Sequence, residues 1–442
     1  MMYRMLAAQL LFLALLPPAA FAQRQRCGTS EPGAGVAAAP SDCGYFTNQP
    51  QAEYEPSCYY EIQVVFHVIQ RTTGEGFLSA STIQDQIDVL NEDFQALPGS
   101  PGAPGTDGRV RFQLATLDPQ GQPTTGITYH MNDSWYLDSG NYWSGVAWDT
   151  HRYLNIYTNA VPCCYGYVPG FPSEGLAGQA KDRVVLWWEA VGRNGTSGWP
   201  LNMGRTATHE VGHYLGLYHT FCGGCGSAGA CYSTGDLICD TNGEANSTSG
   251  CPSSKSSCGN PDPIHNYMDY SDDPCLWEFT PEQVNRMRCT LFNWRPLLAA
   301  SNQVGVGTNY CISVVNSSGN AASIKADGLP SVSANLMTLS ATGAAHNTVG
   351  LYYYGPSQTQ TPFGDGFRCV GGLINRLPPP LVSDGAGASA RPLDFSLPPF
   401  DAGPGMLSPG STWNFQYWFR DPTGPGGSGF NLSDALSITF CP

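Results

Sequence analysis

The alternation of apolar and polar positions predicts strands and helices in turn along residues 58–300. Residues 61–70 form one β-branched and apolar run, which is typical of a buried strand. Residues 81–97 then follow a helical period, with apolar side chains recurring every three or four positions. Further strand-like runs, separated by loops rich in Gly and Pro, occupy residues 110–117, 153–158 and 183–188. This alternation predicts a domain of the α/β (α+β) class with a mixed sheet.

Two helix starts are predicted from capping residues. Ser81 and Gln84 fit a capping box at the start of the first helix. Thr280 followed by Pro281 predicts a later helix with Thr280 as its N-cap, because proline is favoured at the first helical position.

After residue 300 the pattern changes to strands alone. Strand-like runs without a helical period occupy residues 310–316, 336–341, 349–354, 413–420 and 435–440. They predict an all-β, sandwich-like domain over residues 301–442. The aromatic residues at period two in the fourth run are predicted to be core. The alternative is a binding platform that uses Trp413, Tyr417 and Trp418.

The chain begins with a candidate export signal. Arg4 precedes an apolar run, and Ala20 and Ala22 supply small residues at the −3 and −1 positions of a cleavage site. We therefore predict a signal peptide over residues 1–22. The apolar run is shorter than the roughly 20 residues of a membrane-spanning helix, so no membrane span is expected. Residues 23–57 lack periodic hydrophobicity and are predicted to be an irregular leader.

Composition and charge narrow the classes of partner and compartment. Lys and Arg number 20 against 35 Asp and Glu, a net charge of −15. This balance argues against nucleic acid as a partner, because phosphate binding needs clustered cations. Sixteen cysteines are too many for a reducing compartment, so disulfides and secretion are expected. Cys311 and Cys441, near the two ends of the predicted β domain, are candidates for one such bridge.

The segment from His209 to His219 carries the pattern H-E-x-x-H-x-x-G-x-x-H. On a helix, His209 and His213 lie on the same face, so both imidazoles can point at one metal ion. Gly216 can take a positive φ and turn the chain, so that His219 supplies a third nitrogen. Three protein ligands leave a fourth position open, which is typical of a catalytic zinc site. Glu210 lies beside them and is the candidate general base.

The motif is followed by a methionine in a Tyr-Met-Asp-Tyr turn at residues 267–270. With the stretches GRTAT at residues 204–208 and NYMDYSDD at residues 266–273, it resembles the metzincin clan of zinc endopeptidases and, within that clan, the pappalysin family. The resemblance extends over residues 60–300. It implies a metzincin catalytic domain in which the histidine motif lies on an active-site helix.

This resemblance also implies roles for individual residues. A zinc ion would be held by His209, His213 and His219, and Met268 would form the hydrophobic floor beneath it. Tyr270 would swing between the metal and the developing oxyanion, where a donor is needed in the transition state. The alternative for Tyr270 is an aromatic side chain that only packs in the turn.

A cysteine near the predicted signal cleavage site is a candidate for latency. Cys27 lies in the stretch Arg26-Cys27-Gly28-Thr29, and a thiolate is a good fourth ligand for an open zinc site. The resemblance implies a cysteine switch, so that residues 23–57 would be a removable pro-segment of a latent zymogen. The alternative is a Cys27–Cys43 disulfide, which keeps the number of paired cysteines even.

The loop-like stretch between His219 and Met268 is rich in cysteine. The resemblance implies the disulfides Cys231–Cys258 and Cys251–Cys275. Cys222, Cys225 and Cys239 depart from the family pattern, so other pairings stay open. Cys222 and Cys225 have Cys-x-x-Cys spacing, and a second metal or redox site is the alternative use of this pair.

Residues 235–241 of the same stretch offer hard oxygen ligands, which suit calcium rather than zinc. The resemblance points to Asp236 and Thr241 as calcium ligands. The alternative is a solvated, Asp-rich turn.

The sequence as a whole predicts a secreted zinc metalloendopeptidase that acts on protein or peptide substrates, with a β-domain tail. The alternative is a secreted adhesion or glycan-binding protein in which the tail is the working part; the presence of Glu210 argues against it. Relatives that prefer a basic residue after the scissile bond use an acidic residue to bind it. Asp272 and Asp273 lie nearby, but the sequence alone does not identify the counterpart.

Overall fold

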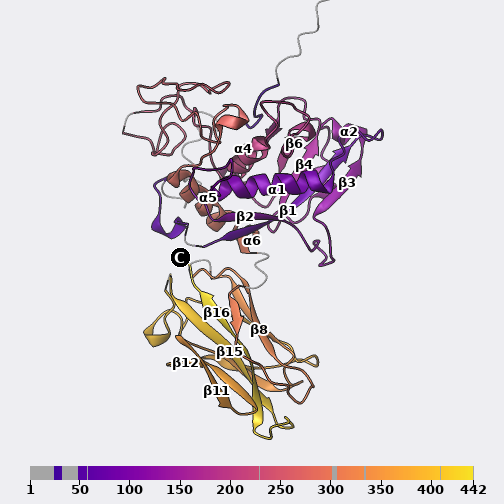
Figure 1. The fold of residues 1–442 in the computed structure, drawn as a ribbon, viewed down its shortest axis with the longest axis vertical. Coiled ribbons are helices and arrows are strands. Elements are labelled where there is room, and N and C mark those ends of the chain that lie inside the picture. Colours follow the sequence, from indigo (N-terminus) through magenta and orange to yellow (C-terminus); the bar gives the residue numbers. More distant parts are fainter. Residues whose placement is uncertain are drawn as a thin grey trace, which may run out of the picture.

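The computed structural model describes residues 24–31, 48–56, 58–227, 229–300, 306–332, 335–408 and 410–441. The predicted signal peptide, most of the predicted leader and Cys43 therefore lie outside the described residues. Figure 1 shows two lobes, which we name the α/β region (residues 24–300) and the β region (residues 306–441). In the described part of the chain, no helix is long and apolar enough to cross a membrane.

A six-stranded mixed sheet forms the centre of the α/β region (Figure 1). Its strands are β1 (Tyr60–Gln70), β2 (Val110–Leu114), β3 (Ile127–Met131), β4 (Leu154–Asn159), β5 (Gly166–Tyr167) and β6 (Val184–Trp187). The order is β2-β1-β4-β6-β5, and β3 pairs with the second half of β1. These pairs are parallel except for β5, which runs antiparallel to β6 at the edge. The predicted mixed α/β sheet is therefore present.

Helices cover both faces of this sheet. They are α1 (Ala80–Phe94), α2 (Asp133–Tyr136), α3 (Trp143–Val146), α4 (Arg205–Tyr214), α5 (Pro281–Asn293) and α6 (Pro296–Ala300). Alternate β1 residues share the main apolar core with α1, α4 and α5, while an aromatic cluster from α2 and the neighbouring loops covers the opposite face. Because both faces are covered, β1 is buried along almost its whole length, and this explains its continuous apolar run. Single-turn 3₁₀ helices occupy Ala52–Tyr54, Pro172–Glu174, Trp188–Ala190, Asp273–Cys275 and Gly403–Gly405.

The two predicted helix starts have different outcomes. Thr280 and Gln283 form a capping box at the start of α5, with Pro281 as the first helical residue, as predicted. The predicted start at Ser81 is wrong by two residues. The cap of α1 is Ser79, whose hydroxyl accepts from the Thr82 amide at 3.1 Å, because Ser79 has an extended backbone while Ser81 is already helical.

The β region contains three antiparallel sheets (Figure 1). Its strands are β7 (Thr308–Tyr310), β8 (Ser323–Gly328), β9 (Met337–Thr342), β10 (Val349–Gly355), β11 (Ser357–Phe363), β12 (Gly366–Gly371), β13 (Asn375–Val382), β14 (Ser389–Leu393), β15 (Thr412–Asp421) and β16 (Gly429–Thr439). The five-stranded sheet β13-β10-β15-β16-β7 and the three-stranded sheet β14-β9-β8 share one apolar core. The predicted core aromatics of β15 are in that core: Trp413, Phe415, Tyr417 and Phe419. The third sheet is the hairpin β11–β12.

The disulfides differ from several expected pairings. The expected Cys311–Cys441 bridge is wrong: Cys311 pairs with Cys369, and Cys441 pairs with Cys58, which links the two regions covalently. The first strand of the β region lies at the sheet edge, where the Tyr310 hydroxyl donates to the Cys369 carbonyl at 2.9 Å, so Cys369 rather than Cys441 is the near neighbour.

The cysteine-rich stretch also pairs differently from the pattern that the resemblance implied. Cys225 bonds Cys258, and Cys231 bonds Cys239 across a short turn with a Cα separation of 5.1 Å, so the expected Cys231–Cys258 pair is wrong. Cys251 is joined to Cys275. Because Cys225 is in a disulfide, a metal or redox site built on Cys222 and Cys225 is also wrong. Among the described residues, Cys27 and Cys222 carry free thiols.

Candidate metal centre

Helix α4 positions the first two histidines of the motif. All ten of its residues are buried, and His209 and His213 lie one turn apart on the same face. The helix ends at Tyr214, and Gly216 has a φ of +93°, a left-handed conformation that suits glycine. The turn at Gly216 brings His219 back against the helix. The sequence motif therefore produces the three-histidine cluster through one helix and one turn.

The three imidazoles converge through their Nε2 atoms. The Nε2 atom of His213 lies 3.1 Å from that of His209 and 3.0 Å from that of His219, and the third pair is 3.1 Å apart. Each Nδ1 faces an acceptor on the outer side: the Tyr267 carbonyl at 2.7 Å, the Leu217 carbonyl at 2.7 Å and the Glu31 carboxylate. Because each Nδ1 donates its proton outward, all three Nε2 atoms present lone pairs to one point.

Three lone pairs cannot satisfy one another, so this arrangement needs a cation. Burial, together with the two neighbouring histidines, lowers the pKa of His209 well below its ordinary value, and burial also lowers the pKa of His213. Neutral imidazole is the form that binds metals. Ligands of a tetrahedral zinc ion at roughly 2.0–2.1 Å stand roughly 3.3 Å apart, close to the spacing of these nitrogens. The donor set therefore fits zinc, with outer partners that fix each ring.

Cys27 closes the fourth side of the cluster. Its Sγ and the three histidine nitrogens all lie within 4.8 Å of one another, and all four residues are buried. Burial raises the pKa of the Cys27 thiol, and the charge of Glu210 adds to this effect. A bound cation would act in the opposite sense, since a coordinating thiol loses its proton. The alternative Cys27–Cys43 disulfide is not formed, because Cys27 is a free thiol.

Glu210 lies beside the cluster in a closely fitted space. Its Oε2 accepts from the Thr29 hydroxyl at 3.0 Å, and burial raises its pKa to about 8. A Cβ at Gly166 on the edge strand β5 would lie 2.8 Å from the Glu210 Cγ, so only glycine leaves room for the glutamate here. Thr29 and Gly166 are site residues that the motif gave no means of finding, because they come from distant parts of the chain.

Met268 and Tyr270 both lie close to the histidine motif. Met268 is fully buried under α4, where a Cβ at Gly212 would lie 2.5 Å from its Sδ. The Tyr270 ring is half-buried, with its centroid 5.0 Å from that of His219 and 5.7 Å from that of His209. Burial raises the pKa of Tyr270, so its hydroxyl stays protonated and can donate a hydrogen bond.

The described part of the leader runs along β5 and carries Cys27 to the histidines. Its backbone pairs with the edge of the sheet through Gly28 N–H donating to the Gly166 carbonyl at 2.9 Å, and through a parallel bridge between Gln25 and Cys164. The Thr29 hydroxyl accepts from the Val168 amide at 2.9 Å. The leader thus occupies the strand edge next to the candidate metal ligands.

Arg26, directly before Cys27, forms a buried ion pair with Asp273. The two side chains meet at 2.7 Å with exposed fractions of 6% and 0%. The other Asp273 oxygen accepts from the Met203 amide at 2.9 Å, which fixes the carboxylate. The structure therefore distinguishes Asp273 from its neighbour Asp272, which the sequence could not do.

The expected calcium residues, Asp236 and Thr241, lie close together within the cysteine-rich stretch. The Thr241 hydroxyl donates to Asp236 Oδ2 at 2.7 Å, and the Ile238 amide donates to Oδ1 at 3.2 Å. Burial raises the pKa of Asp236 to about 7. Within the described ranges, the cluster of His, Cys, Asp or Glu ligand atoms close enough to hold one ion is the one at Cys27 and the three histidines. The calcium site stays a prediction.

Comparison with known proteins adds independent information. The family described as pregnancy-associated plasma protein-A matches residues 141–292. An extracellular metalloprotease of Verticillium alfalfae is 36% identical over 288 residues, which cover 61% of this chain and 91% of that protein. An extracellular metalloprotease of Pyricularia oryzae is 34% identical over 289 residues, covering 61% and 89%.

Solved structures that match include mirolysin and its precursor from Tannerella forsythia. A promirolysin mutant is 33% identical with a TM-score of 0.48, and the match covers 56% of this chain and 86% of that one. Mature mirolysin in complex with a cleaved peptide is 36% identical with a TM-score of 0.43, covering 53% and 92%.

Proposed function

Since this chain belongs to the pappalysin family of metalloproteases, we propose that it is a secreted zinc endopeptidase made in a latent form. The observation that carries this proposal is the convergence of three Nε2 lone pairs at 3.0–3.1 Å beside a buried glutamate. An adhesion protein with an auxiliary metal site is not favoured, because the relatives are metalloproteases and the general base is present.

The mechanism assigns each step to residues of the chain. His209, His213 and His219 would hold Zn²⁺, which would polarise the scissile carbonyl and acidify a water molecule. Glu210 is placed to take a proton from the attacking water and to return it to the leaving amine. Tyr270, protonated at its hydroxyl, donates toward the charge that develops on the carbonyl oxygen. Met268 supports the histidine helix from below.

Substitution of the base tests the assignment. Glu210→Gln keeps the shape of the side chain but cannot accept a proton, so peptide cleavage is expected to fall by about 10²–10⁴-fold while zinc content is unchanged. Zinc per chain and cleavage of a peptide library are measured on the processed protein. Glu75→Gln, at an exposed surface ion pair with Arg71, is the matched control and should retain both properties. Cleavage by the Glu210→Gln protein at the wild-type rate would contradict the proposal.

Latency is proposed to depend on Cys27. Replacing Cys27 by Ser removes the thiolate ligand, so the unprocessed protein is expected to cleave peptides without prior removal of the leader. The control is Cys222→Ser, which removes the other free thiol of the described residues. Activity of the unprocessed chain is compared for both variants. A latent Cys27→Ser protein would show that the thiol does not cause latency.

The Arg26–Asp273 pair suggests which substrates the processed enzyme prefers. Because the leader occupies the strand edge beside the metal ligands, we infer that Asp273 receives a basic side chain directly after the scissile bond. Asp273→Asn is expected to reduce kcat/KM for such substrates by about 10- to 100-fold, since a hydrogen bond to a charged group contributes roughly 1.5–3 kcal/mol. Asp272→Asn is the control. Equal losses for substrates with leucine at that position would indicate a structural role.

Other sequence-based expectations are part of the same proposal. We propose residues 1–22 as signal peptide, 23–57 as removable pro-segment, 58–300 as catalytic domain and 301–442 as a sandwich-like β domain. The core shared by the two larger sheets of the β region supports the last of these. Calcium at Asp236 and Thr241 is proposed for stability, and the test is a fall in melting temperature on calcium removal while zinc is kept saturating.

A further inference from the structure

The leader carries a second arginine into a defined environment next to the candidate site. The Arg24 guanidinium lies over the Trp187 ring, 4.3 Å from its centroid. Its Nη1 donates to the Cys164 carbonyl at 3.1 Å and to the Val161 carbonyl. Burial lowers the pKa of the Arg24 guanidinium, and the negative charge of Glu189 acts in the opposite direction. We name the Trp187 ring, Glu189 and the two carbonyls the Trp187 subsite.

The sheet edge holds the Trp187 subsite in place. Trp187 ends β6, and its ring lies 5.4 Å from that of Tyr165 on the adjoining loop. Between the two arginines, Gln25 pairs with the same loop: its carbonyl accepts from the Tyr165 amide at 3.0 Å. The leader thus places one arginine at Asp273 and another, two residues farther from Cys27, at the Trp187 subsite. These features belong to the enzyme and would remain when the leader is removed.

We propose that the Trp187 subsite binds a lysine or arginine side chain of the substrate, at the third position after the scissile bond. This rests on the proposed function, in which Asp273 receives the first residue after that bond. Both arginines lie on the same side of Cys27 along the leader, so the two cation positions lie on the same side of the metal ligands. A ring face and converging carbonyls attract a cation without an ion pair. The preferred substrate would therefore carry two basic residues separated by one.

A pair of matched peptides tests this inference. Both carry arginine directly after the scissile bond, and the third residue after it is arginine in one and citrulline in the other, which keeps the shape and removes the charge. The processed wild-type enzyme is expected to show a kcat/KM about fivefold higher for arginine, the scale of a partly exposed cation–π contact. Trp187→Leu is expected to remove that ratio. Asp149→Asn, which removes an exposed carboxylate paired with Arg152, should keep it.

The outcomes separate the two proposals. Cleavage of both peptides at equal rates by the wild-type enzyme would overturn the Trp187 subsite alone. An unchanged preference for arginine in the Trp187→Leu protein would also overturn it. Absence of cleavage of either peptide, with zinc bound and the leader removed, would instead contradict the proposed function.

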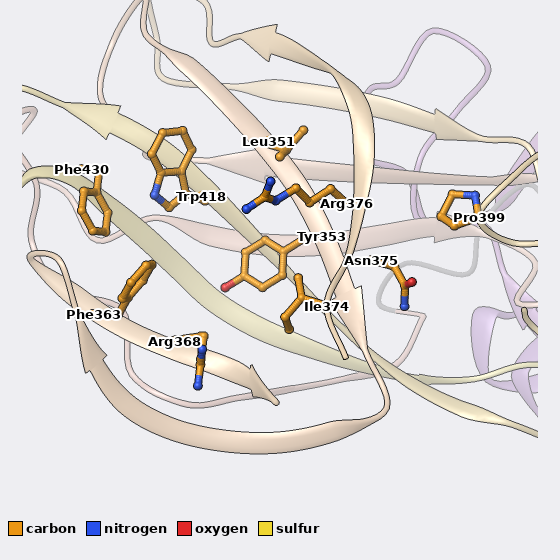
Figure 2. A pocket seen from close by; sticks show the side chains of 10 residues that line it. All are labelled: Leu351, Tyr353, Phe363, Arg368, Ile374, Asn375, Arg376, Pro399, Trp418 and Phe430. Carbon is orange, nitrogen blue, oxygen red and sulfur yellow. The ribbon is translucent and has the colours of Figure 1, made fainter. Parts of the chain in front are cut away.

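A second, independent inference concerns the β region. A cavity of about 780 Å³ lies on the face of the five-stranded sheet opposite the shared core, next to the hairpin β11–β12 (Figure 2). Trp418 on β15 lines it, while its neighbours Tyr417 and Phe419 point into the core. A volume of this size is in the range of small-molecule sites. Of the three aromatics considered for a binding platform, Trp418 alone lines this cavity.

The lining combines aromatic rings with two arginines. Figure 2 shows Tyr353 with Arg368 and Arg376 on either side of it, and Trp418 and Phe430 along one wall. The Trp418 and Phe430 ring centroids are 5.8 Å apart. The lining includes no Asp or Glu. In the described part of the chain neither arginine forms an ion pair, although the protein carries a net charge of −15.

We infer that this cavity binds an acidic polysaccharide that contains uronic acid. Planar guanidinium groups match carboxylates in a bidentate geometry, and the aromatic faces between them provide apolar surface for sugar rings. The ring-lined wall distinguishes this ligand from a peptide that is merely acidic. The site would hold the protease near a carboxylated matrix without taking part in cleavage.

Binding is tested with the full-length Glu210→Gln protein and oligogalacturonate by titration calorimetry. The Glu210→Gln protein with an unchanged cavity lining is expected to bind oligogalacturonate and not neutral dextran. Replacing both Arg368 and Arg376 by Gln should weaken binding at least tenfold, which is the scale of one charge-assisted pair. Trp418→Ala should also weaken binding, because it removes apolar surface for a sugar ring. Arg420→Gln, on the same strand as Trp418 but outside the lining, is the control. Equal binding of poly-glutamate, or unchanged binding in the lining variants, would overturn the inference.

Discussion

The two regions of the molecule bury polar side chains in different ways. The α/β region buries ion pairs, among them that of Arg295 with Asp182, whose side chains have exposed fractions of 2% and 0%. Among the described residues of the β region, Asp421 is the one buried charged side chain, and its carboxylate accepts from the backbone amide of Ser317. The remaining buried polar groups there are amides and hydroxyls such as Gln416 and Ser433.

This difference shows where the molecule buries charged side chains. Burying a charge costs several kcal/mol unless it is paired and hydrogen-bonded. The α/β region buries polar groups at and around helix α4 despite this free-energy cost, because the histidines, Glu210 and Asp273 need fixed orientations. The β region has an apolar core of aromatic and aliphatic side chains, and apart from Asp421 its described charged groups are not buried. We therefore expect perturbations of charge to act on the first region and perturbations of packing to act on either.

Metal removal should give the largest contrast between the regions. A chelator that removes zinc is expected to abolish cleavage and to lower the melting temperature of the α/β region, because a ligand at 1,000 times its Kd stabilises the folded state by about 4.1 kcal/mol. The transition of the β region should be unchanged. Calorimetry with and without chelator, followed by zinc addition, measures both. A shift of both transitions together would show that the regions unfold as one unit.

Breaking the buried ion pair between Arg295 and Asp182 should destabilise the α/β region nearly as strongly as zinc removal. Asp182→Ala leaves the Arg295 guanidinium buried without its carboxylate, and about 3–5 kcal/mol of unfolding free energy is expected to be lost. The matching change in the β region, Asp421→Ala, removes the carboxylate that accepts from the Ser317 amide and should cost about 1–3 kcal/mol. Lys325→Ala, at an exposed pair, should cost no more than about 1 kcal/mol. Urea unfolding measures the free energy of unfolding of the three variants. Equal losses would contradict the expected difference between the two regions.

A packing change in the β region should affect stability without affecting catalysis. Phe415→Leu in the β15 core is expected to cost about 1–2 kcal/mol, because the smaller and differently shaped side chain fills the site poorly. Cleavage of a short peptide should keep its kcat/KM, since Phe415 lies far from helix α4 in the chain and outside its core. A tenfold fall in kcat/KM would reveal coupling between the regions.

Mild acid should lower the stability of the α/β region through protonation of His67 in the unfolded chain. Burial lowers its pKa to about 3, while the unfolded chain takes up this proton near pH 6.5. Stability is therefore lost as the pH falls below 6.5, by up to about 1.4 kcal/mol per pH unit from this residue. His130 and Tyr157 face the ring, with Asn155 and Thr128 as hydrogen-bond partners. Unfolding of wild type and His67→Gln at pH 7 and pH 5 measures the effect, and a parallel loss in both would assign it elsewhere.

Local patterns were sufficient for the parts of the site that lie close together in the sequence. The spacing of His209 and His213 places them on one helical face whatever surrounds the helix, and Gly216 allows the turn that returns His219. The same holds for Thr280 at the start of α5 and for the period-two aromatics of β15. Secondary structure is set within a few residues, so these features could be predicted. The position of Ser79 as the true cap shows that element ends are less well determined by pattern.

Contacts between segments that are distant in the sequence could not be predicted from local patterns. Only the folded chain decides that Cys231 bonds Cys239, because pairing depends on which Cα atoms come within about 4.4–6.8 Å. Likewise, Asp273 rather than Asp272 meets Arg26, across 247 positions of sequence. The sequence by itself thus determined which histidines are candidate metal ligands, through helical periodicity and spacing, and it carried the family resemblance. The tertiary structure decided the leader's path, the disulfides and the two arginine contacts, since these depend on packing across the whole sheet.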